Sequence, residues 1–144
     1  MKKKRFEMPV AVHLLLIKDS KILLLRRFNT GYEDGNYSVV AGHTDGDEDV
    51  TAAMIREAKE EAGIEITSKN INFASVMHRK SDDERIDFFF VADEWKGEVI
   101  NMEPQKCDDL SWFEMDNLPS NIIPYIKRGI ENYTSGVHFD VYGL

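Results

Sequence analysis

The stretch from Gly42 to Ile64, GHTDGDEDVTAAMIREAKEEAGI, constrains the fold of this chain more than any other. At about 100° per residue in an α-helix, Glu57, Glu60 and Glu61 fall on one face, because they are three or four positions apart. A second stripe is mostly apolar and consists of Thr51, Met54, Ile55, Ala58 and Ala62. The spacing therefore predicts a helix with one core face and one acidic face.

Crowded carboxylates repel one another and destabilise a helix unless a cation neutralises them. Seven acidic side chains lie in or beside the predicted helix: Asp45, Asp47, Glu48, Asp49, Glu57, Glu60 and Glu61. A hard divalent cation with oxygen ligands, Mg²⁺ or alternatively Mn²⁺, matches such a cluster. The alternative is a solvated surface, which is the common role of charged residues on a helix. A Ca²⁺-binding loop is disfavoured, because the alternating oxygen ligands of such a loop are not in the sequence.

The wider spacing separates these alternatives. Five residues lie between Gly42 and Glu48, and seven more precede the pair Arg56-Glu57. An apolar residue, Lys59, Glu60-Glu61, Ala62, Gly63 and Ile64 follow. This 23-residue pattern resembles the Nudix box of the MutT-type pyrophosphohydrolases at every fixed position. The turn differs, because Gly46-Asp47-Glu48 stands where the family often has Pro-Gly-Glu, and we expect a different loop path there.

The resemblance implies an α+β protein with the Nudix fold, an α/β/α sandwich with a central mixed β-sheet. It also implies hydrolysis of a diphosphate bond and a metal held by the carboxylates of Glu57, Glu60 and Glu61 and the carbonyl of Ala41. Glu48 and Arg56 resemble the pair that braces the loop against the helix. The resemblance leaves the general base open between Glu57, Glu61 and an acid outside the box, for which this chain offers Glu103 and Asp109.

Three residues other than the acidic side chains are candidates for substrate binding. The resemblance indicates Arg27 for phosphate, since the pair Arg26-Arg27 is similar to a strand-end pair in MutT-like proteins. His43 directly follows Gly42 and would face the phosphates. Asn121 resembles an asparagine that reads a purine, although its position before a predicted helix also fits an N-cap. The remaining histidines, His13, His78 and His138, show no metal-ligand spacing.

Length and charge limit the partners of the chain. Its 144 residues fit one domain, 1–144, which can bury a core without disulfides. A net charge of −8 disfavours a broad nucleic-acid-binding surface, so we expect a small-molecule nucleotide as the partner. We expect no membrane segment, because no apolar run is long enough to span a bilayer. We expect a reducing, cytoplasmic location, because the one cysteine, Cys107, has no partner for a disulfide. A monomer and a homodimer are both compatible with the sequence.

Hydrophobic runs separated by turn residues predict the remaining elements. A hairpin is expected from Val10–Ile17 and Ile22–Leu25, and the acidic helix should begin near Asp47–Asp49 and end at Gly63. The other expected elements are strands at Tyr37–Ala41, Ile64–Ile66, Ile71–His78, Ile86–Ala92 and Leu110–Phe113, a helix at Ile122–Asn132, and a strand or ordered tail at Val137–Tyr142.

The substrate is less constrained than the bond. The sequence lacks the proline and tyrosine signals that the resemblance associates with ADP-ribose and dinucleoside polyphosphates. This favours a (deoxy)nucleoside triphosphate, cleaved to the monophosphate and pyrophosphate. The alternatives are ADP-ribose, a nucleotide sugar or an RNA 5′ end, and a non-catalytic module that senses a nucleotide.

Overall fold

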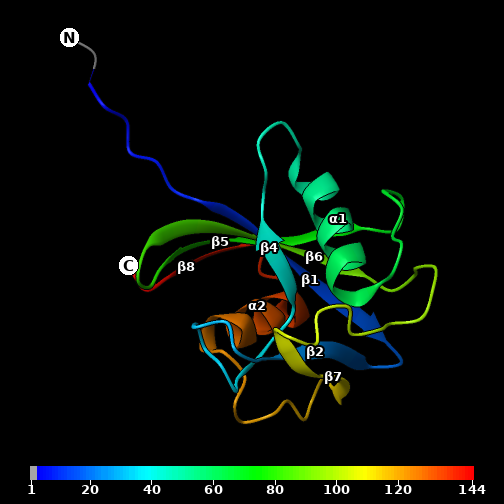
Figure 1. The fold of residues 1–144 in the computed structure, drawn as a ribbon. Coiled ribbons are helices and arrows are strands. Elements are labelled where there is room, and N and C mark those ends of the chain that lie inside the picture. The colour runs from blue at the N-terminus through cyan, green and yellow to red at the C-terminus, as the bar shows by residue number, and fades with distance from the viewer. Residues whose placement is uncertain (1–2) are drawn as a thin grey trace.

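The structure is a computed structural model that describes residues 3–144. The strands are β1 Val10–Lys18, β2 Lys21–Arg27, β3 Tyr37–Ser38, β4 Val40–His43, β5 Asn72–Lys80, β6 Glu84–Ala92, β7 Cys107–Glu114 and β8 Phe139–Tyr142. The helices are α1 Val50–Ala62 and α2 Pro124–Ser135. Figure 1 shows the two helices on opposite sides of the strands, so the expected α+β sandwich is confirmed.

The sheet is mixed, as expected. One part has β1 at its centre, antiparallel to β4 and parallel to β6, and it continues through β5 to β8. The other part is antiparallel, with β2 between β3 and β7. The predicted hairpin joins the two parts. Asp19 and Ser20 both have positive φ, which suits a tight two-residue turn, but β1 and β2 pair only at Ile17–Ile22 and Lys18–Lys21 before they diverge.

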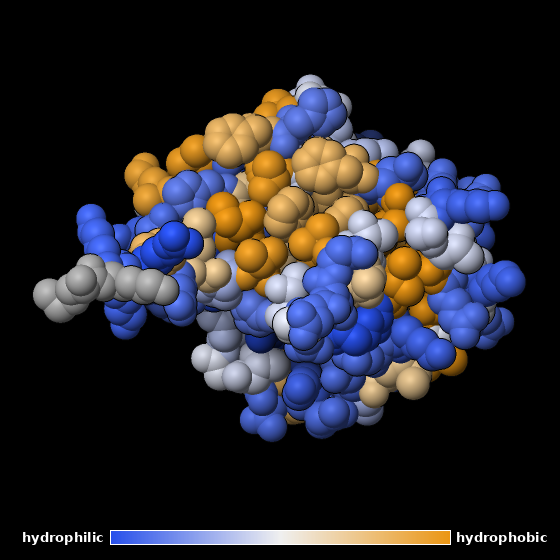
Figure 2. All heavy atoms as spheres, turned by 90° about the horizontal axis from the view of Figure 1, so that it is seen from above, coloured by the Kyte–Doolittle hydropathy of each residue, from blue (hydrophilic) through white to orange (hydrophobic). Residues whose placement is uncertain are grey.

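Alternation along β1 supplies two cores. Val12, Leu14 and Leu16 pack with α1, whereas Leu15 packs in a second core with α2. Each helix therefore buries its apolar face against one side of the same strand. The remaining exposed apolar side chains include Phe139 on the edge strand β8, and Figure 2 shows apolar side chains gathered on the face seen from above.

Two expectations about strands are wrong in detail. Ile64–Ile66 is not a strand: both isoleucines are buried, but only Glu65 pairs, with Lys96, before the chain turns. The strand expected at Tyr37–Ala41 is split at Val39 into β3 and β4, because the chain there passes from one part of the sheet to the other.

The second helix begins at Pro124, with Ile123 as its N-cap, so Asn121 does not cap it as one interpretation proposed. Proline fits this first helical position, because it lacks an N–H that would have no helical partner. In the described part of the chain, no helix is long and apolar enough to cross a membrane.

Candidate active site

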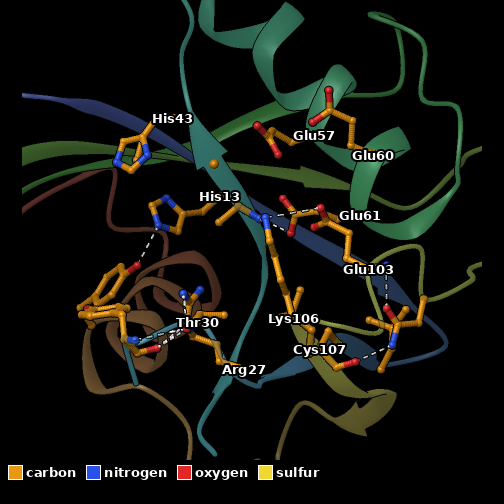
Figure 3. A pocket seen from close by; sticks show the side chains of 18 of the residues that line it. His13, Arg27, Thr30, His43, Glu57, Glu60, Glu61, Glu103, Lys106 and Cys107 are labelled. Atoms are coloured by element: carbon orange, nitrogen blue, oxygen red, sulfur yellow. Dashed lines mark hydrogen bonds and ion pairs between the residues drawn. The ribbon is translucent and has the colours of Figure 1, made fainter. Parts of the chain in front are cut away.

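A cavity of about 470 Å³ lies beside α1 and reaches down to α2. Figure 3 shows Glu57, Glu60 and Glu61 on one side of it, with Arg27 and Thr30 on the other. Strand β4 contributes Ala41, Gly42 and His43 to the wall between them. The topology therefore brings the acidic face of α1 and the end of β2 to one hollow, although they are about thirty residues apart in sequence.

Local signals at both ends position α1. Asp49 is the N-cap, and its carboxylate accepts a hydrogen bond from the Ala52 N–H at 2.8 Å. Gly63 ends the helix with φ 69°, the left-handed conformation that glycine adopts without a steric penalty. Ala53, Met54, Ala58 and Ala62 are buried, whereas Ala52 and Lys59 are exposed. This orientation turns the three glutamates toward the cavity.

Gly42 and Glu57 are in close contact. A Cβ atom on Gly42 would lie 2.3 Å from the Glu57 Cδ, which is far inside van der Waals contact. The glycine therefore lets the Glu57 carboxylate lie directly against strand β4. Only 13% of the Glu57 side chain is exposed, so this carboxylate has little water around it.

Glu61 has the most strongly perturbed acid group of the cavity. Burial and, after it, the neighbouring Glu57 carboxylate raise the pKa of Glu61 well above its usual range. The Ala41 N–H donates to Glu61 Oε1 at 3.4 Å and opposes this shift only in part. A cation bound beside these two carboxylates would stabilise the ionised form of Glu61.

Arg56 neutralises part of this charge from outside the cavity. Its guanidinium donates to both oxygens of Glu48, at 2.7 and 3.2 Å, and to Glu57 Oε1 at 2.9 Å and Glu60 Oε2 at 3.3 Å. It also donates to the His43 carbonyl at 3.2 Å. The hydrogen bond from Arg56 is the main cause that lowers the pKa of Glu48. Arg56 thus ties α1 to the chain before it.

Because Arg56 holds Glu57 and Glu60, these side chains are not gathered around a common point. Among residues 3–144, no three acidic, histidine or cysteine side chains form a preassembled cation cage. The donor set nevertheless fits Mg²⁺ in chemical type, because this hard cation takes carboxylate, carbonyl and water oxygens as ligands. The Glu60 side chain is 54% exposed, in contrast to the more buried Glu57.

In the turn before α1, the residue with positive φ is not the glycine. Asp47 has φ 64°, whereas Gly46 does not have positive φ. The left-handed residue of this turn is therefore an aspartate, a residue type that tolerates this conformation better than most. The Asp45 N–H donates to Glu48 Oε1 at 2.8 Å. Glu48 therefore binds both the backbone of the turn and the Arg56 guanidinium.

The structure separates the two outside candidates for the general base. Glu103 lines the cavity and lies near Glu61 and Lys106 in Figure 3. Asp109 does not line it. The Asp109 carboxylate accepts hydrogen bonds from Ser111 and Tyr37, and these lower its pKa. On β7, Leu110 lines the cavity, whereas its neighbour Asp109 does not.

Arg27 lines the cavity but is already engaged. Its Nε donates to the Tyr32 carbonyl at 2.6 Å and its Nη2 to Thr30 Oγ1 at 3.0 Å. Asp34 stabilises the same loop by accepting from the Thr30 and Gly31 N–H groups. Arg27 thus holds the loop after β2 in shape and presents its guanidinium 5.2 Å from the Tyr32 ring centre.

The other two substrate candidates lie in different places. His43 lines the cavity, and its Nε2 is 3.3 Å from Arg85 Nη1. Asn121 is not among the lining residues. Its amide donates to the Gly35 carbonyl at 2.8 Å, and its own carbonyl accepts from the Tyr37 N–H. Asn121 therefore binds the backbone of the loop after β2 and does not face the cavity.

Sequence reasoning gave no role to seven polar residues of the cavity wall, which are His13, Thr30, Tyr32, Arg85, Asn101, Lys106 and Tyr125. His13 is 2% exposed, and its Nε2 lies 3.0 Å from the Tyr125 hydroxyl. These two residues are 112 positions apart, so no local spacing links them. Lys106 approaches Glu103 at 4.0 Å, and its spacing of three residues was the one signal that could have been noticed.

The fold and cavity define a class: an α+β sandwich in which one helix presents three carboxylates to a cavity of about 470 Å³. Comparison with known proteins gives the family. The model of the NUDIX domain matches residues 7–133, and the chain belongs to this family. The expected resemblance is confirmed.

Individual relatives agree with this assignment. A solved structure of a MutT NUDIX hydrolase from Burkholderia pseudomallei matches with a TM-score of 0.81 and 25% identity, over 88% of this chain and 98% of that one. An ADP-ribose pyrophosphatase from Methanocaldococcus jannaschii is 32% identical over 76% of this chain and 64% of its own length. An NAD-capped RNA hydrolase from Shigella dysenteriae is 28% identical over 74% of this chain. This chain spans only 39% of the length of that hydrolase.

Proposed function

We propose that this protein is a Nudix-type pyrophosphohydrolase that cleaves a diphosphate bond in a nucleoside diphosphate linked to a second group. The observation that carries the proposal is the contact of Glu57 and Glu61 beside Gly42 in the cavity. The two carboxylates lie close together, and the pKa of Glu61 is raised. Such an arrangement suits a metal-assisted reaction. The first candidate substrate is a (deoxy)nucleoside triphosphate, cleaved to the monophosphate and pyrophosphate.

We assign the metal to the carboxylates of Glu57, Glu60 and Glu61 and the carbonyl of Ala41, with Mg²⁺ as the ion and Mn²⁺ as the alternative. When bound, the ion would neutralise the diphosphate oxygens and acidify a water molecule. Glu48 and Arg56 are positioning residues, because they hold the loop and the helix together. A carboxylate without a metal contact would accept the proton of the attacking water, and Glu103, which lines the cavity, is the candidate outside the metal-binding set. Glu57 or Glu61 would take this role only if it does not bind the metal.

The substrate phosphates would be bound at the wall between the carboxylates and the loop after β2. His43, Arg85 and Lys106 place nitrogen donors on this wall. Arg27 contributes positive charge, while its side-chain hydrogen bonds keep the loop in position. Asn121 is assigned a supporting role behind this loop and not a direct substrate contact, because its amide is bound to the Gly35 carbonyl.

The test is hydrolysis of a substrate panel with Mg²⁺, read as release of phosphate or pyrophosphate. The panel contains (deoxy)nucleoside triphosphates, ADP-ribose, nucleotide sugars and an NAD-capped RNA. Glu60→Gln and Glu61→Gln should each reduce kcat by at least about 100-fold while the fold is retained, because each loses a metal contact. Glu65→Gln removes an exposed carboxylate just beyond the helix and should keep wild-type activity.

The panel also separates the second candidate function. The named activities of two relatives favour ADP-ribose or an NAD-capped RNA end, and preferential cleavage of either would replace the triphosphate assignment. A protein that binds nucleotides and hydrolyses none of the panel would be a non-catalytic nucleotide sensor. Full activity of Glu60→Gln and Glu61→Gln would refute the roles given to these residues.

A further inference from the structure

The cavity has a second polar end that the proposed hydrolysis does not use. His13 from β1 and Tyr125 from α2 line this end, on the side of the cavity away from the α1 carboxylates. Figure 3 shows His13 below His43 with its ring directed away from Glu57, and a dashed line marks its hydrogen bond. The loop after β2 closes the same end with Thr30 and Tyr32.

The direction of each hydrogen bond at this end is fixed by chemistry. His13 Nδ1 lies 3.3 Å from the Phe88 carbonyl oxygen, which can only accept, so Nδ1 carries the proton. In a neutral ring, Nε2 is then an acceptor, and the Tyr125 hydroxyl donates to it across 3.0 Å. The Tyr125 proton is thereby committed to His13. The oxygen of Tyr125 can offer only its lone pairs to a ligand.

The burial of His13 supports the neutral form. Desolvation by burial lowers the pKa of His13 to about 4, although Asp87 opposes this shift. At neutral pH the ring carries one proton, as the carbonyl contact requires. Burial likewise raises the pKa of Tyr125, so this hydroxyl stays protonated. The chain of donors therefore runs in one direction at physiological pH.

A buried ion pair fixes the position of Tyr125. Arg79 Nε donates to Asp87 Oδ2 at 2.6 Å, and the two side chains are 3% and 0% exposed. The guanidinium of Arg79 lies 3.5 Å from the Tyr125 ring centre. Such a buried pair stabilises a fold poorly compared with apolar residues of similar size. Its geometry here instead defines where the tyrosine ring, and therefore its acceptor oxygen, is placed.

We propose that Tyr125, oriented by His13, is a specificity-determining residue whose oxygen accepts a hydrogen bond from the exocyclic amino group of a nucleobase. The inference rests on the proposed function, because it assumes that the group attached to the diphosphate extends from the carboxylates to this end. Tyr32, beside Arg27, provides an aromatic surface on the same wall for the base. Ligands that lack an amino donor leave the Tyr125 oxygen without a partner and bind less tightly.

Direct binding tests this without hydrolysis. Calorimetry compares nucleoside monophosphates in pairs that differ by one amino group: GMP with IMP, and AMP with purine riboside monophosphate. The wild-type protein should bind the amino-bearing member of at least one pair about 5- to 10-fold more tightly. Tyr125→Phe keeps the ring over Arg79 and should abolish this preference. Tyr133→Phe, on the exposed side of the same helix, should keep it.

Kinetics provides a second readout if the protein is active. Tyr125→Phe should raise KM for the preferred substrate about 5- to 10-fold and leave kcat within about twofold, because the contact is distant from the reacting bond. Equal binding of both members of each pair by the wild-type protein, or an unchanged preference in Tyr125→Phe, would overturn the inference. Failure of the hydrolysis panel alone would overturn only the proposed function, since the binding preference does not depend on catalysis.

Discussion

The two ends of the cavity treat charge in opposite ways. At the α1 end, Glu57, Glu60 and Glu61 share the single guanidinium of Arg56, which is also bound to Glu48. At the α2 end, Arg79 and Asp87 form a pair of one cation and one anion, and His13 and Tyr125 beside them are neutral. The first end has excess negative charge, whereas the second is balanced within the chain.

This difference indicates what each end needs from a ligand. Negative charge that the protein itself leaves uncompensated favours a cation from outside. Burial is the main cause of the raised pKa of Glu61, and the neighbouring Glu57 carboxylate adds to it. A balanced and buried cluster has no such need, and its remaining capacity is hydrogen bonding from fixed positions. Removing a carboxylate from the α1 end should therefore stabilise the metal-free protein, whereas removing one charge from the α2 end should destabilise it.

The largest expected effect is on stability at the balanced end. Arg79→Met leaves the fully buried Asp87 carboxylate without its partner and should lower the free energy of unfolding by about 3–5 kcal/mol. Urea denaturation at pH 7 measures this. Arg128→Met removes a cation from a partly exposed pair with Asp140 and should cost less than about 1 kcal/mol.

A double variant sharpens this result. Arg79→Met with Asp87→Leu removes both charges and should recover much of the lost stability, because an apolar pair avoids the desolvation cost. A double variant no more stable than Arg79→Met would mean that the loss comes from packing and not from an unpaired charge.

At the same end, the buried neutral His13 should make the free energy of unfolding depend on pH. Its pKa is about 4 in the fold, against an ordinary value of 6.5, so the unfolded chain binds a proton that the folded protein does not. The free energy of unfolding should therefore fall as pH decreases from about 6.5 to 4, by about 3 kcal/mol in full. His13→Gln should lose this part of the pH dependence in urea titrations between pH 7 and 4. His138→Gln replaces an exposed histidine and is the matched control, and identical pH profiles for the two variants would contradict the assignment to His13.

The sequence predicted the α1 end well and the α2 end hardly at all. Every feature of α1 is local: the cap at Asp49, the left-handed Gly63 and the three- and four-residue spacing of the glutamates. The contact of His13 with Tyr125 depends on how β1 lies under α2, which spacing along the chain does not encode. Arg79 and Asp87 are eight residues apart, but only the packing around β5 and β6 shows that both are buried.

The errors have the same physical origin. Ile64–Ile66 has the alternation of a strand, yet its two isoleucines pack under α1 without a neighbouring strand to pair with. Asn121 has the residue type of an N-cap, but the helix begins two residues later than expected because Pro124 fits its first position. Local patterns identify which side chains are buried more reliably than they identify hydrogen-bond partners.

At the α1 end, the contact of Gly42 with Glu57 gives the next largest effect. Gly42→Ala places a Cβ 2.3 Å from the Glu57 Cδ and must displace the carboxylate or strand β4. A displacement of about 1 Å at a reacting group can cost about 100-fold in rate, and we expect a loss of that order in kcat/KM. Gly46→Ala adds a Cβ with no atom within 4 Å at a position without positive φ, so it should keep wild-type activity. Similar activities of the two variants would argue against a defined position for Glu57 in the reaction.

The smallest effect directly tests the charge imbalance at the α1 end. In a chelator, Glu61→Gln should stabilise the protein slightly, because it removes a carboxyl group whose ionised form is disfavoured by burial and by the neighbouring Glu57. Mg²⁺ at about ten times its Kd should stabilise the wild-type protein by about 1.4 kcal/mol and Glu61→Gln much less. Thermal unfolding with and without Mg²⁺ measures both the effect of the substitution and the effect of the ion on stability. If Glu61→Gln instead destabilises the metal-free protein, Glu61 is held as a satisfied anion, and the two ends of the cavity do not differ in the way described.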